Sequence, residues 1–442
     1  MPGEHDEEAE GPAPLREVVT SVLTARRVLV VVGWLLGSGA WALLLLRHLS
    51  RHWPHAIKAP GFGDLFQRLR ESGILVHGGD PYVIGARISD NVPPSVSLLH
   101  LPLYLSGHMG AAFEATWLSV ASMAVICAVL LTTVRPVPRR WALLGATVVA
   151  PPIFGLCFYP TVAALVAGQD QLWFMALVIV DLFAISRWRR GVLVGAVAGF
   201  SLWPAIFALP VLLSSGLRSI RRLATGFVIT IVAGAFLSIG ESWRYWTYLV
   251  PSGQVTSRGV NSSATWPGHA FGLIENYSLN GFVSRAPLGG ALASRLVYVV
   301  IFLIVVGAGV AIGWALWRAT LPVTAVAMLS IAAVESTPFA WDHHWVWVLM
   351  MLPFAALECW RSHRVLSVLL WLSLVPFERQ LSARVGSHFS PMAHGQPILR
   401  NWFNVLFLNR YQLTGLIVLA AAGIVMVLAA RRATPTTGQT SS

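Results

Sequence analysis

The carboxylates best placed for chemistry lie in two polar segments near the start of the chain. Asp64 ends a glycine-rich stretch, Gly61–Asp64, where a carboxylate can act as a general base or can cap a helix. Asp80 lies in the sequence Gly79-Asp80-Pro81-Tyr82, which is typical of a turn. Asp64 and Asp80 are therefore both candidate bases, and Tyr82 is a secondary candidate beside Asp80.

A histidine pair, His343-His344, follows Trp341-Asp342 at the start of an apolar stretch. Adjacent side chains on a helix diverge by about 100°, so the two imidazoles are poorly placed to share one metal ion. One of them is better suited to a hydrogen bond with a phosphate or a sugar. The alternative is an interfacial pair that binds nothing. Asp342 is either a helix cap or a residue that orients a histidine.

The composition identifies the elements that must position these residues as membrane-spanning helices. Hydrophobic residues make up 56% of the 442 residues and charged residues 11%, whereas a soluble domain carries about 25% charge. This excludes a soluble enzyme, a disordered protein and a fibrous protein, and the long apolar runs disfavour a β-barrel. The net charge of +12 indicates cytoplasmic arginines that set topology, rather than nucleic-acid binding. The three cysteines are expected to be buried apolar residues.

Long apolar runs predict ten spans and one interrupted stretch. The stretch 191–214 contains Pro204 and Pro210 and lies between two arginine clusters, which favours a hairpin of two short helices over a single span. Counting it as two helices gives an all-α bundle of about twelve spans, within a range of 10–13. The ten spans are Val28–Leu46, Ala111–Thr132, Trp141–Phe158, Leu172–Ser186, Ala224–Gly240, Arg295–Trp317, Leu321–Thr337, His344–Trp360, Val365–Phe377 and Gln412–Ala430.

Short arginine clusters between the spans predict the orientation of the chain in the plasma membrane. If these clusters face the cytoplasm, both termini are cytoplasmic and the long segments 48–110, 241–293 and 378–410 lie outside. Within the first of them, Ser97–Leu105 is too short to span and is expected to lie along the membrane surface. We expect one transmembrane domain over residues 28–430, with disordered cytoplasmic tails at 1–27 and 431–442.

The polar clusters all fall on the outer side in this topology. A transporter usually places its polar residues within the spans, but here only Asp181, Glu335 and Glu358 are prominent there. A catalytic surface above an apolar bundle fits better, acting on a substrate that is half lipid and half polar. Arginines on this side, against the positive-inside trend, are candidates for an anionic ligand: Arg285, Arg379, Arg384 and Arg400.

Five motifs in these segments together resemble a known family. They are Asp64-Leu65, Gly79-Asp80-Pro81-Tyr82 followed by Pro93-Pro94, Gly168-Gln169, Asn276-x-Ser278-Leu279-x-Gly281 followed by Arg285, and Trp341-Asp342-His343-His344. Their order around the spans resembles the actinobacterial polyprenyl-phosphate-mannose-dependent α-mannosyltransferases of glycosyltransferase family 87, which have a GT-C fold. The chain departs from the family pattern at Val92, at Ser201 and at Asp170-Gln171.

The resemblance implies the chemistry and the roles of the residues. A β-linked mannosyl phosphate that yields an α-linked product requires one inverting displacement, with a general base at the acceptor hydroxyl and polar groups on the departing phosphate. Asp64 is then the base, and His343 or His344 contacts the phosphate or the sugar. Arg285 is the expected phosphate ligand, and Asn276, Ser278 and Gln169 are expected to bind sugar hydroxyls. Asp80, Tyr82, Asp342 and Arg384 are secondary candidates.

The expected function is therefore a membrane mannosyltransferase on the outer face of the plasma membrane. Its partners would be a polyprenyl-phosphate sugar, a glycolipid acceptor such as a phosphatidylinositol mannoside or lipoglycan, and membrane lipids, with no nucleic acid. No cofactor and no metal are expected, and no glycine fingerprint for a nucleotide is found. The alternatives are a transferase that uses another lipid-linked sugar, such as arabinofuranose, and a transporter or flippase of lipid-linked sugars.

Overall fold

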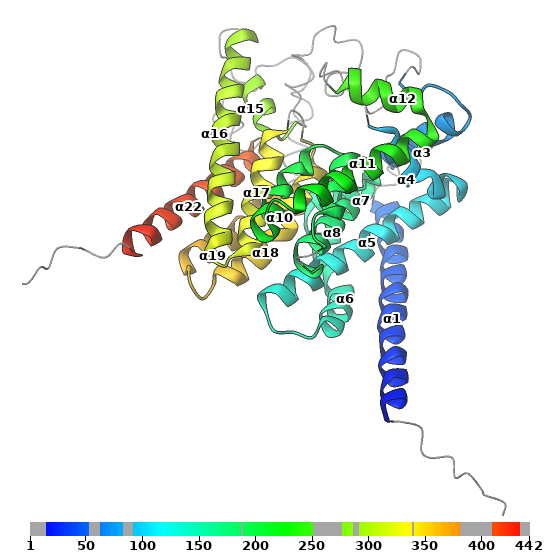
Figure 1. Ribbon diagram of the computed structural model, residues 1–442, viewed down its shortest axis with the longest axis horizontal. Helices are drawn as coiled ribbons and strands as arrows, with labels where there is room; N and C mark the ends of the chain where they lie inside the picture. Colours follow the sequence, from blue (N-terminus) through cyan, green and yellow to red (C-terminus); the bar gives the residue numbers. More distant parts are fainter. Residues whose placement is uncertain are drawn as a thin grey trace, which may run out of the picture.

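A computed structural model describes residues 15–52, 62–82, 92–186, 189–250, 276–285, 291–337, 340–380 and 409–433. These parts of the chain are helical and contain no strand, apart from one isolated bridge between Phe158 and Glu378. The expected all-α class is confirmed. Figure 1 shows how the helices are arranged.

In the part of the chain that the structure describes, six helices are long and apolar enough to cross a membrane. A seventh crossing is counted if a helix pair bent by 115° forms one broken span. The structure therefore shows a multi-pass bundle, and by this measure the expected count of about twelve is not reached. The six segments are Arg27–Leu49, Gly107–Val134, Arg139–Cys157, Ser219–Leu237, Leu296–Arg318 and Arg410–Ala430.

These segments belong to helices that pack around shorter ones. The long helices are α1 (Leu15–His52), α5 (Gly107–Val134), α6 (Arg139–Cys157), α11 (Ser219–Leu237), α16 (Ala291–Arg318) and α22 (Arg410–Ala433). Shorter apolar helices complete the bundle: α7 (Tyr159–Ala167), α8 (Gln171–Ile179), α9 (Val192–Phe200), α10 (Ala208–Ser215), α17 (Pro322–Ser336), α18 (Val346–Cys359) and α19 (Arg364–Leu372). Single turns continue several of them: η1 (Val180–Ala184), η2 (Trp203–Phe207) and η5 (Val375–Phe377).

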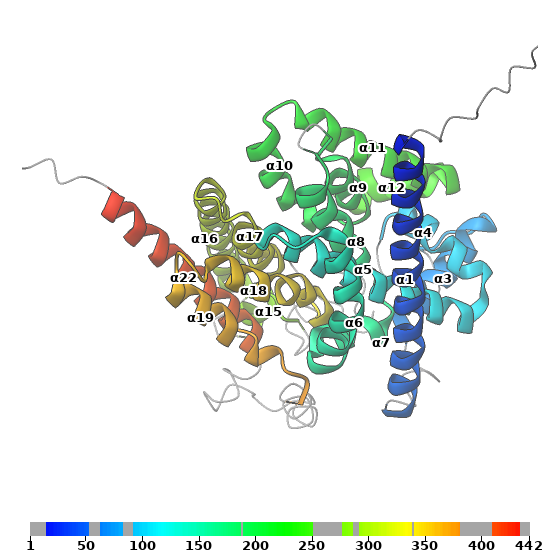
Figure 2. The ribbon, with the colours of Figure 1, turned by 90° about the horizontal axis from the view of Figure 1, so that it is seen from below.

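The core lies where α8, α17 and α18 meet. Almost every residue of these three helices is buried, so their sequences are apolar on all sides rather than amphipathic. Figure 2 places them between α19 and α22 on one flank and α1, α3 and α4 on the other. The outer helices, in contrast, expose large apolar side chains such as Leu29, Phe236 and Leu303, as expected for surfaces that face lipid.

The stretch 191–214 is divided, as expected, but the division falls just before Pro204, and Pro210 lies within α10 (Ala208–Ser215). The helix α9 ends at Phe200, and η2 and α10 follow after Ser201 and Leu202. The helix α1 begins at Leu15, within the segment 1–27 that was expected to form a tail, and residues 1–14 lie outside the described residues. At the other end α22 continues to Ala433, and residues 434–442 also lie outside them.

Two of the three acidic residues within the bundle cap neighbouring helices. The carboxylate of Asp181 accepts hydrogen bonds from the backbone N–H groups of Gly191 and Val194, each 2.9 Å long, at the start of α9. Glu358 accepts hydrogen bonds from the backbone N–H groups of Val323 and Thr324 at the start of α17. Unpaired N–H groups at a helix start carry partial positive charge, so both carboxylates have structural roles.

Several short helices lie at one end of the molecule. They are α3 (Gly63–Val76), α4 (Pro94–Leu105), α12 (Ile239–Arg244) with η3 (Tyr245–Leu249), and α15 (Leu279–Arg285). Figure 1 shows α3, α12 and α15 along the upper edge, opposite the lower end where α1 begins and where α5 is joined to α6. The helix α4 covers the segment that was expected to lie along the membrane surface. The helix α3 was not expected.

Candidate active site

Asp64 lies in the first turn of α3, beside the bend between α7 and α8. The helix begins after Phe62, whose left-handed backbone (φ 57°) directs its N–H to the carbonyl of Val166, 2.7 Å away in α7. Phe62 is thus the capping residue, and the capping alternative for Asp64 does not describe its position. The Oδ2 atom of Asp64 instead accepts a hydrogen bond from the side-chain amide of Gln169.

Gly168 makes this meeting possible. It ends α7 in a left-handed conformation with φ 69°, which glycine adopts without steric cost. A Cβ atom at this position would lie 2.6 Å from the Cβ of Leu65, one residue after Asp64. The missing side chain therefore lets the end of α7 approach the start of α3. Gln169 follows at the corner of the bent pair.

Asp170 and Gln171, the departure from the family pattern, connect this corner to an aromatic cluster. Both side chains are buried. The Nε2 group of Gln171 donates to Asp170 over 3.4 Å, and its Oε1 accepts a 3.1 Å hydrogen bond from the indole of Trp347 in α18. The ring of Trp347 packs edge-on against Trp203 at 4.7 Å. Gln171 thereby holds the start of α8 to α18.

The histidine pair lies in the 3-10 turn η4 (Asp342–Trp345), just before α18 begins at Val346. The two ring centroids are only 4.6 Å apart. The two side chains therefore do not diverge as they would on a regular α-helix. The Nδ1 atom of His344 accepts a 2.9 Å hydrogen bond from the backbone N–H of Trp341. The proton of a neutral His344 is therefore on Nε2.

Both imidazoles are neutral near pH 7. Burial lowers the pKa of His344 to about 4. Burial also lowers the pKa of His343 well below its usual range, and the nearby positive charge of Arg68 lowers it further. Neutral imidazoles can donate hydrogen bonds to a phosphate, but they supply no positive charge.

Asn276 joins two distant segments of the chain. Its side-chain Oδ1 accepts hydrogen bonds from the hydroxyl of Ser278 (2.8 Å), from the backbone of Ser278 (3.2 Å) and from the backbone of Ala340 (3.0 Å). Asn276 and Ser278 are both completely buried. Gly281 is required because a Cβ there would overlap the carbonyl of Asn276. This arrangement makes Asn276 a positioning residue for the turn that begins just after Ala340.

Asp80 and Tyr82 form a structural corner. The Oδ1 atom of Asp80 accepts a 2.7 Å hydrogen bond from the backbone of Tyr82, which confirms the expected turn. The Oδ2 atom forms a 2.7 Å ion pair with Arg244 of α12. The hydroxyl of Tyr82 donates to the carbonyl of Val92 over 2.8 Å. These contacts attach α3 to α12 and favour the turn role over a role as base.

The other candidates are placed as follows. Asp342 opens the η4 turn, and its charge contributes, after burial, to raising the pKa of Tyr277. Trp345 is completely buried, and its indole donates to the carbonyl of Tyr277 over 3.1 Å. The Arg379 guanidinium lies 3.4 Å from His48. The side chain of Arg285 and all of Arg384 and Arg400 lie outside the described residues.

The site elements meet at α7, which contacts both α3 and η4. Asp64 and Gln169 therefore stand on one side of α7, and the histidine turn packs against it. The sequence did not single out Arg68 or His100, which lie in this region. His100 is 1% exposed, and its ring stacks 5.6 Å from that of Trp173. Among the described residues, no three His, Cys, Asp or Glu side chains are arranged to hold a metal ion.

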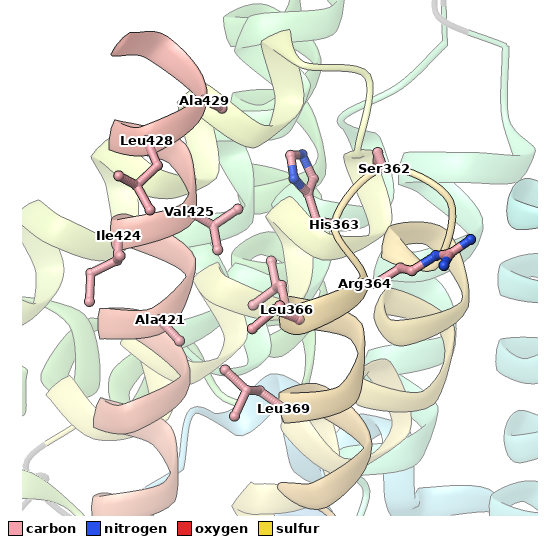
Figure 3. A pocket seen from close by; sticks show the side chains of 11 residues that line it. Ser362, His363, Arg364, Leu366, Leu369, Ala421, Ile424, Val425, Leu428 and Ala429 are labelled. Atoms are coloured by element: carbon pink, nitrogen blue, oxygen red, sulfur yellow. The ribbon is translucent and has the colours of Figure 1, made fainter. Parts of the chain in front are cut away.

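A separate apolar groove lies near the opposite end of the molecule. It has a volume of about 670 Å³ and runs between α19 and α22. Figure 3 shows Leu366 and Leu369 facing Val425 across it, with His363 near one end. It contains none of the candidate site residues.

Comparison with known proteins assigns the architecture to a family. The model of glycosyltransferase family 87 matches residues 93–341, which is more than half of the chain. The chain belongs to glycosyltransferase family 87. It is a membrane glycosyltransferase, and the matched region ends at Trp341, directly before the histidine turn.

Curated relatives extend the similarity beyond that region. A polyprenol-phosphate-mannose-dependent alpha-(1-2)-phosphatidylinositol mannoside mannosyltransferase of Mycobacterium tuberculosis is 28% identical over 377 residues, covering 80% of this chain and 82% of the relative. A protein of the same description from Mycolicibacterium smegmatis is 28% identical over 275 residues, covering 57% and 58%. A pentamannoside mannosyltransferase of that organism is 25% identical over 199 residues, covering 44% of each chain. No solved structure matches the chain.

Proposed function

We propose that this glycosyltransferase moves a mannosyl residue from polyprenyl-phosphate-mannose to a phosphatidylinositol mannoside or a related lipoglycan. The family assignment and the names of the relatives support this donor and acceptor. The observation that carries the proposal is the meeting of Asp64 with Gln169 beside a helix that also contacts the histidine turn. The product would be α-linked.

The reaction is a single displacement at the anomeric carbon. Asp64 takes the proton of the acceptor hydroxyl, whose oxygen forms the new glycosidic bond on the face opposite the phosphate. The bond from the anomeric carbon to the phosphate oxygen breaks, and the lipid phosphate leaves with the bonding electrons. Gln169 holds the carboxylate of Asp64 in place. The Nε2–H of His344, or the adjacent His343, donates a hydrogen bond to the phosphate or the sugar.

The proposed site lies on the outer face of the plasma membrane, and both termini are cytoplasmic. The basic Arg135, Arg139 and Arg140 adjoin the connection between α5 and α6 at the lower end in Figure 1, and α3 lies at the upper edge. Such separation agrees with the bias of arginines towards the cytoplasm. A lipid-linked donor and a glycolipid acceptor would both reach a site at this end of the bundle from within the membrane.

The test uses purified protein in lipid nanodiscs with radiolabelled polyprenyl-phosphate-mannose and a phosphatidylinositol mannoside. We expect an α-mannosylated glycolipid from the wild type. Asp64→Asn should lower the rate by about 10²–10⁴-fold, because the base is lost while the hydrogen-bonding shape is retained. Asp80→Asn, at the structural corner, is the matched control and should lower the rate much less.

Three outcomes would contradict the proposal. Full activity of Asp64→Asn would remove the base assignment. Transfer from a polyprenyl-phosphate arabinofuranose donor but not from the mannose donor would change the substrate. Movement of the labelled lipid between leaflets without a new glycosidic bond would indicate a flippase.

A further inference from the structure

The groove between α19 and α22 is apolar along its length and polar at one end. In Figure 3 Leu369 and Ala421 lie at one end of it, and His363 lies near the other, at the level of Leu428. Ile424 and Leu428 on its α22 side are 60% and 48% exposed, and α22 is long and apolar enough to cross a membrane. In a bilayer the groove therefore opens towards lipid.

The polar end is formed by the turn that joins α18 to α19. The backbone N–H groups of Ser362 and His363 both donate to the carbonyl of Cys359, over 3.2 and 2.7 Å. The hydroxyl of Ser367 donates to the carbonyl of Ala356 over 2.7 Å and fixes the start of α19 against α18. The position of this turn beside the groove is therefore set by the fold.

Arginines gather at this end of the groove. Arg364 lines it, and Arg361, three residues earlier in the same turn, is exposed. The helix α22 continues past Ala429, another lining residue, through Arg431-Arg432. Since α19 leads away from this end while α22 leads towards it, both pairs of arginines belong to the same side of the bundle.

The neighbours of Arg361 and Arg364 leave their charges available. Trp360, directly before Arg361, is 47% exposed, and tryptophan beside arginine is typical of the boundary between lipid and water. Glu358, the acidic residue one turn before Arg361, accepts the hydrogen bonds at the start of α17. In the described part of the chain no ion pair joins Arg361 or Arg364 to an acidic side chain.

We propose that this groove binds an anionic phospholipid, with an acyl chain between α19 and α22 and the head group against Arg361 and Arg364. The chain fills an apolar groove of about 670 Å³ that faces lipid. The lipid phosphate accepts charged hydrogen bonds from the guanidinium groups. The proposed topology assigns this turn to the cytoplasmic side, where anionic lipids attract basic residues. The site goes beyond the proposed function, because the donor phosphate is needed near α3, at the opposite end of the molecule.

The experiment measures binding of two phospholipids with identical dioleoyl chains to the full protein in detergent by native mass spectrometry. The wild type should bind phosphatidylglycerol at least tenfold more tightly than phosphatidylcholine. The double variant Arg361→Gln, Arg364→Gln should bind phosphatidylglycerol about tenfold more weakly and phosphatidylcholine as before. The matched control is the double variant Arg139→Gln, Arg140→Gln, which removes the same charge at the start of α6, outside the groove. It should bind both lipids like the wild type.

A third variant tests the apolar part of the groove. Ala421→Trp places an indole between α19 and α22 and should weaken the binding of both lipids equally. Because a ligand of the folded state stabilises it, phosphatidylglycerol should also raise the unfolding temperature of the wild type more than phosphatidylcholine does. That difference should be lost in the Arg361→Gln, Arg364→Gln variant.

Equal affinity of the wild type for the two phospholipids would overturn the inference. An equal loss of phosphatidylglycerol binding in the Arg139→Gln, Arg140→Gln control would also overturn it, because only the overall charge would then matter. Displacement of phosphatidylglycerol by inorganic phosphate at matched ionic strength would show an anion site without a place for the chain. Unchanged binding of both lipids to Ala421→Trp would exclude the groove, and Ala421→Leu makes the same test if the tryptophan variant does not fold.

Discussion

His343 and His344 are neutral because they are buried in a turn, and this has a measurable consequence for pH. The pKa of His344 is about 4 in the folded protein, below the ordinary value of about 6.5 in an unfolded chain. The unfolded state therefore binds more protons than the folded state between these two values. The stabilisation is fully present above about pH 6.5 and is lost as the pH falls towards 4.

We predict that the thermal unfolding temperature of the wild type falls between pH 7 and pH 5. His344→Gln should show a smaller fall, because glutamine keeps a hydrogen-bonding group without a proton to bind. Differential scanning calorimetry in detergent at the two pH values measures the difference. His363→Gln, at the distant groove, is the control. An equal fall in wild type and His344→Gln would contradict the buried neutral state.

Sequence reasoning identified several of these residues, and the structure adds contacts between them that it did not anticipate. Asp64 and Gln169 were found separately through the family motifs, and only the fold shows that they touch. Asn276 carries an amide that is suitable for sugars, but its oxygen is occupied by donors from Ser278 and Ala340. Arg68 has no motif of its own. Its spacing of one turn from Asp64 was a usable signal only once a helix was expected there.

At the scale of elements, Gly168 serves both the backbone of α7 and its packing on α3. Gly168→Ala should destabilise the protein by about 1–2 kcal/mol for the left-handed backbone and by about 1–3 kcal/mol more for overlap with Leu65. The matched control is Gly78→Ala, which has the same kind of backbone (φ 74°) but nothing within 4 Å of the added Cβ. It should show only the first cost.

Thermal unfolding and transfer activity separate the two effects. Gly168→Ala should lose more activity than its stability alone explains, because α3 and Asp64 are displaced from Gln169. If Gly168→Ala and Gly78→Ala had equal unfolding temperatures and equal activities, the close approach of α7 to α3 would not be required.

The sequence predicted best those helices whose apolar residues form one long, continuous run. The long runs gave α5, α16 and α22 close to their observed bounds. The amphipathic α3 was missed because half of its residues are polar and it lies within a long outer segment. The interruption of 191–214 was predicted because prolines break helices regardless of their surroundings. A turn before α8 was expected between the spans Trp141–Phe158 and Leu172–Ser186, but the helix α7 that fills this interval was not predicted.

At the scale of the whole molecule, the orientation can be tested with single cysteines. Starting from a variant without Cys127, Cys157 and Cys359, His77→Cys places a thiol at the end of α3, and Ser362→Cys places one between α18 and α19. In intact cells a membrane-impermeant maleimide should label His77→Cys. It should label Ser362→Cys only after the membrane is opened. Labelling in the reverse order would invert the proposed topology.

The apolar interior and the proposed site occupy different parts of the molecule. The amino-acid composition therefore indicates a membrane protein but says little about the chemistry of the site. Apolar helices such as α8, α17 and α18 make up the interior. The proposed chemistry depends on a few side chains at one end, which contribute little to any average. The family motifs first indicated which of these side chains are candidates, and the contacts in the structure then showed which of them lie together.

Because α7 ends in a 115° bend before α8, the length of α7 determines where Gln169 lies relative to Asp64. Adding one residue to α7 would turn everything that follows by about 100° and advance it by about 1.5 Å. Gln169 would then face away from Asp64, while the helix itself would remain intact. Natural variation in this family should therefore tolerate substitutions along α7 but not insertions or deletions, a constraint on length rather than on residue type.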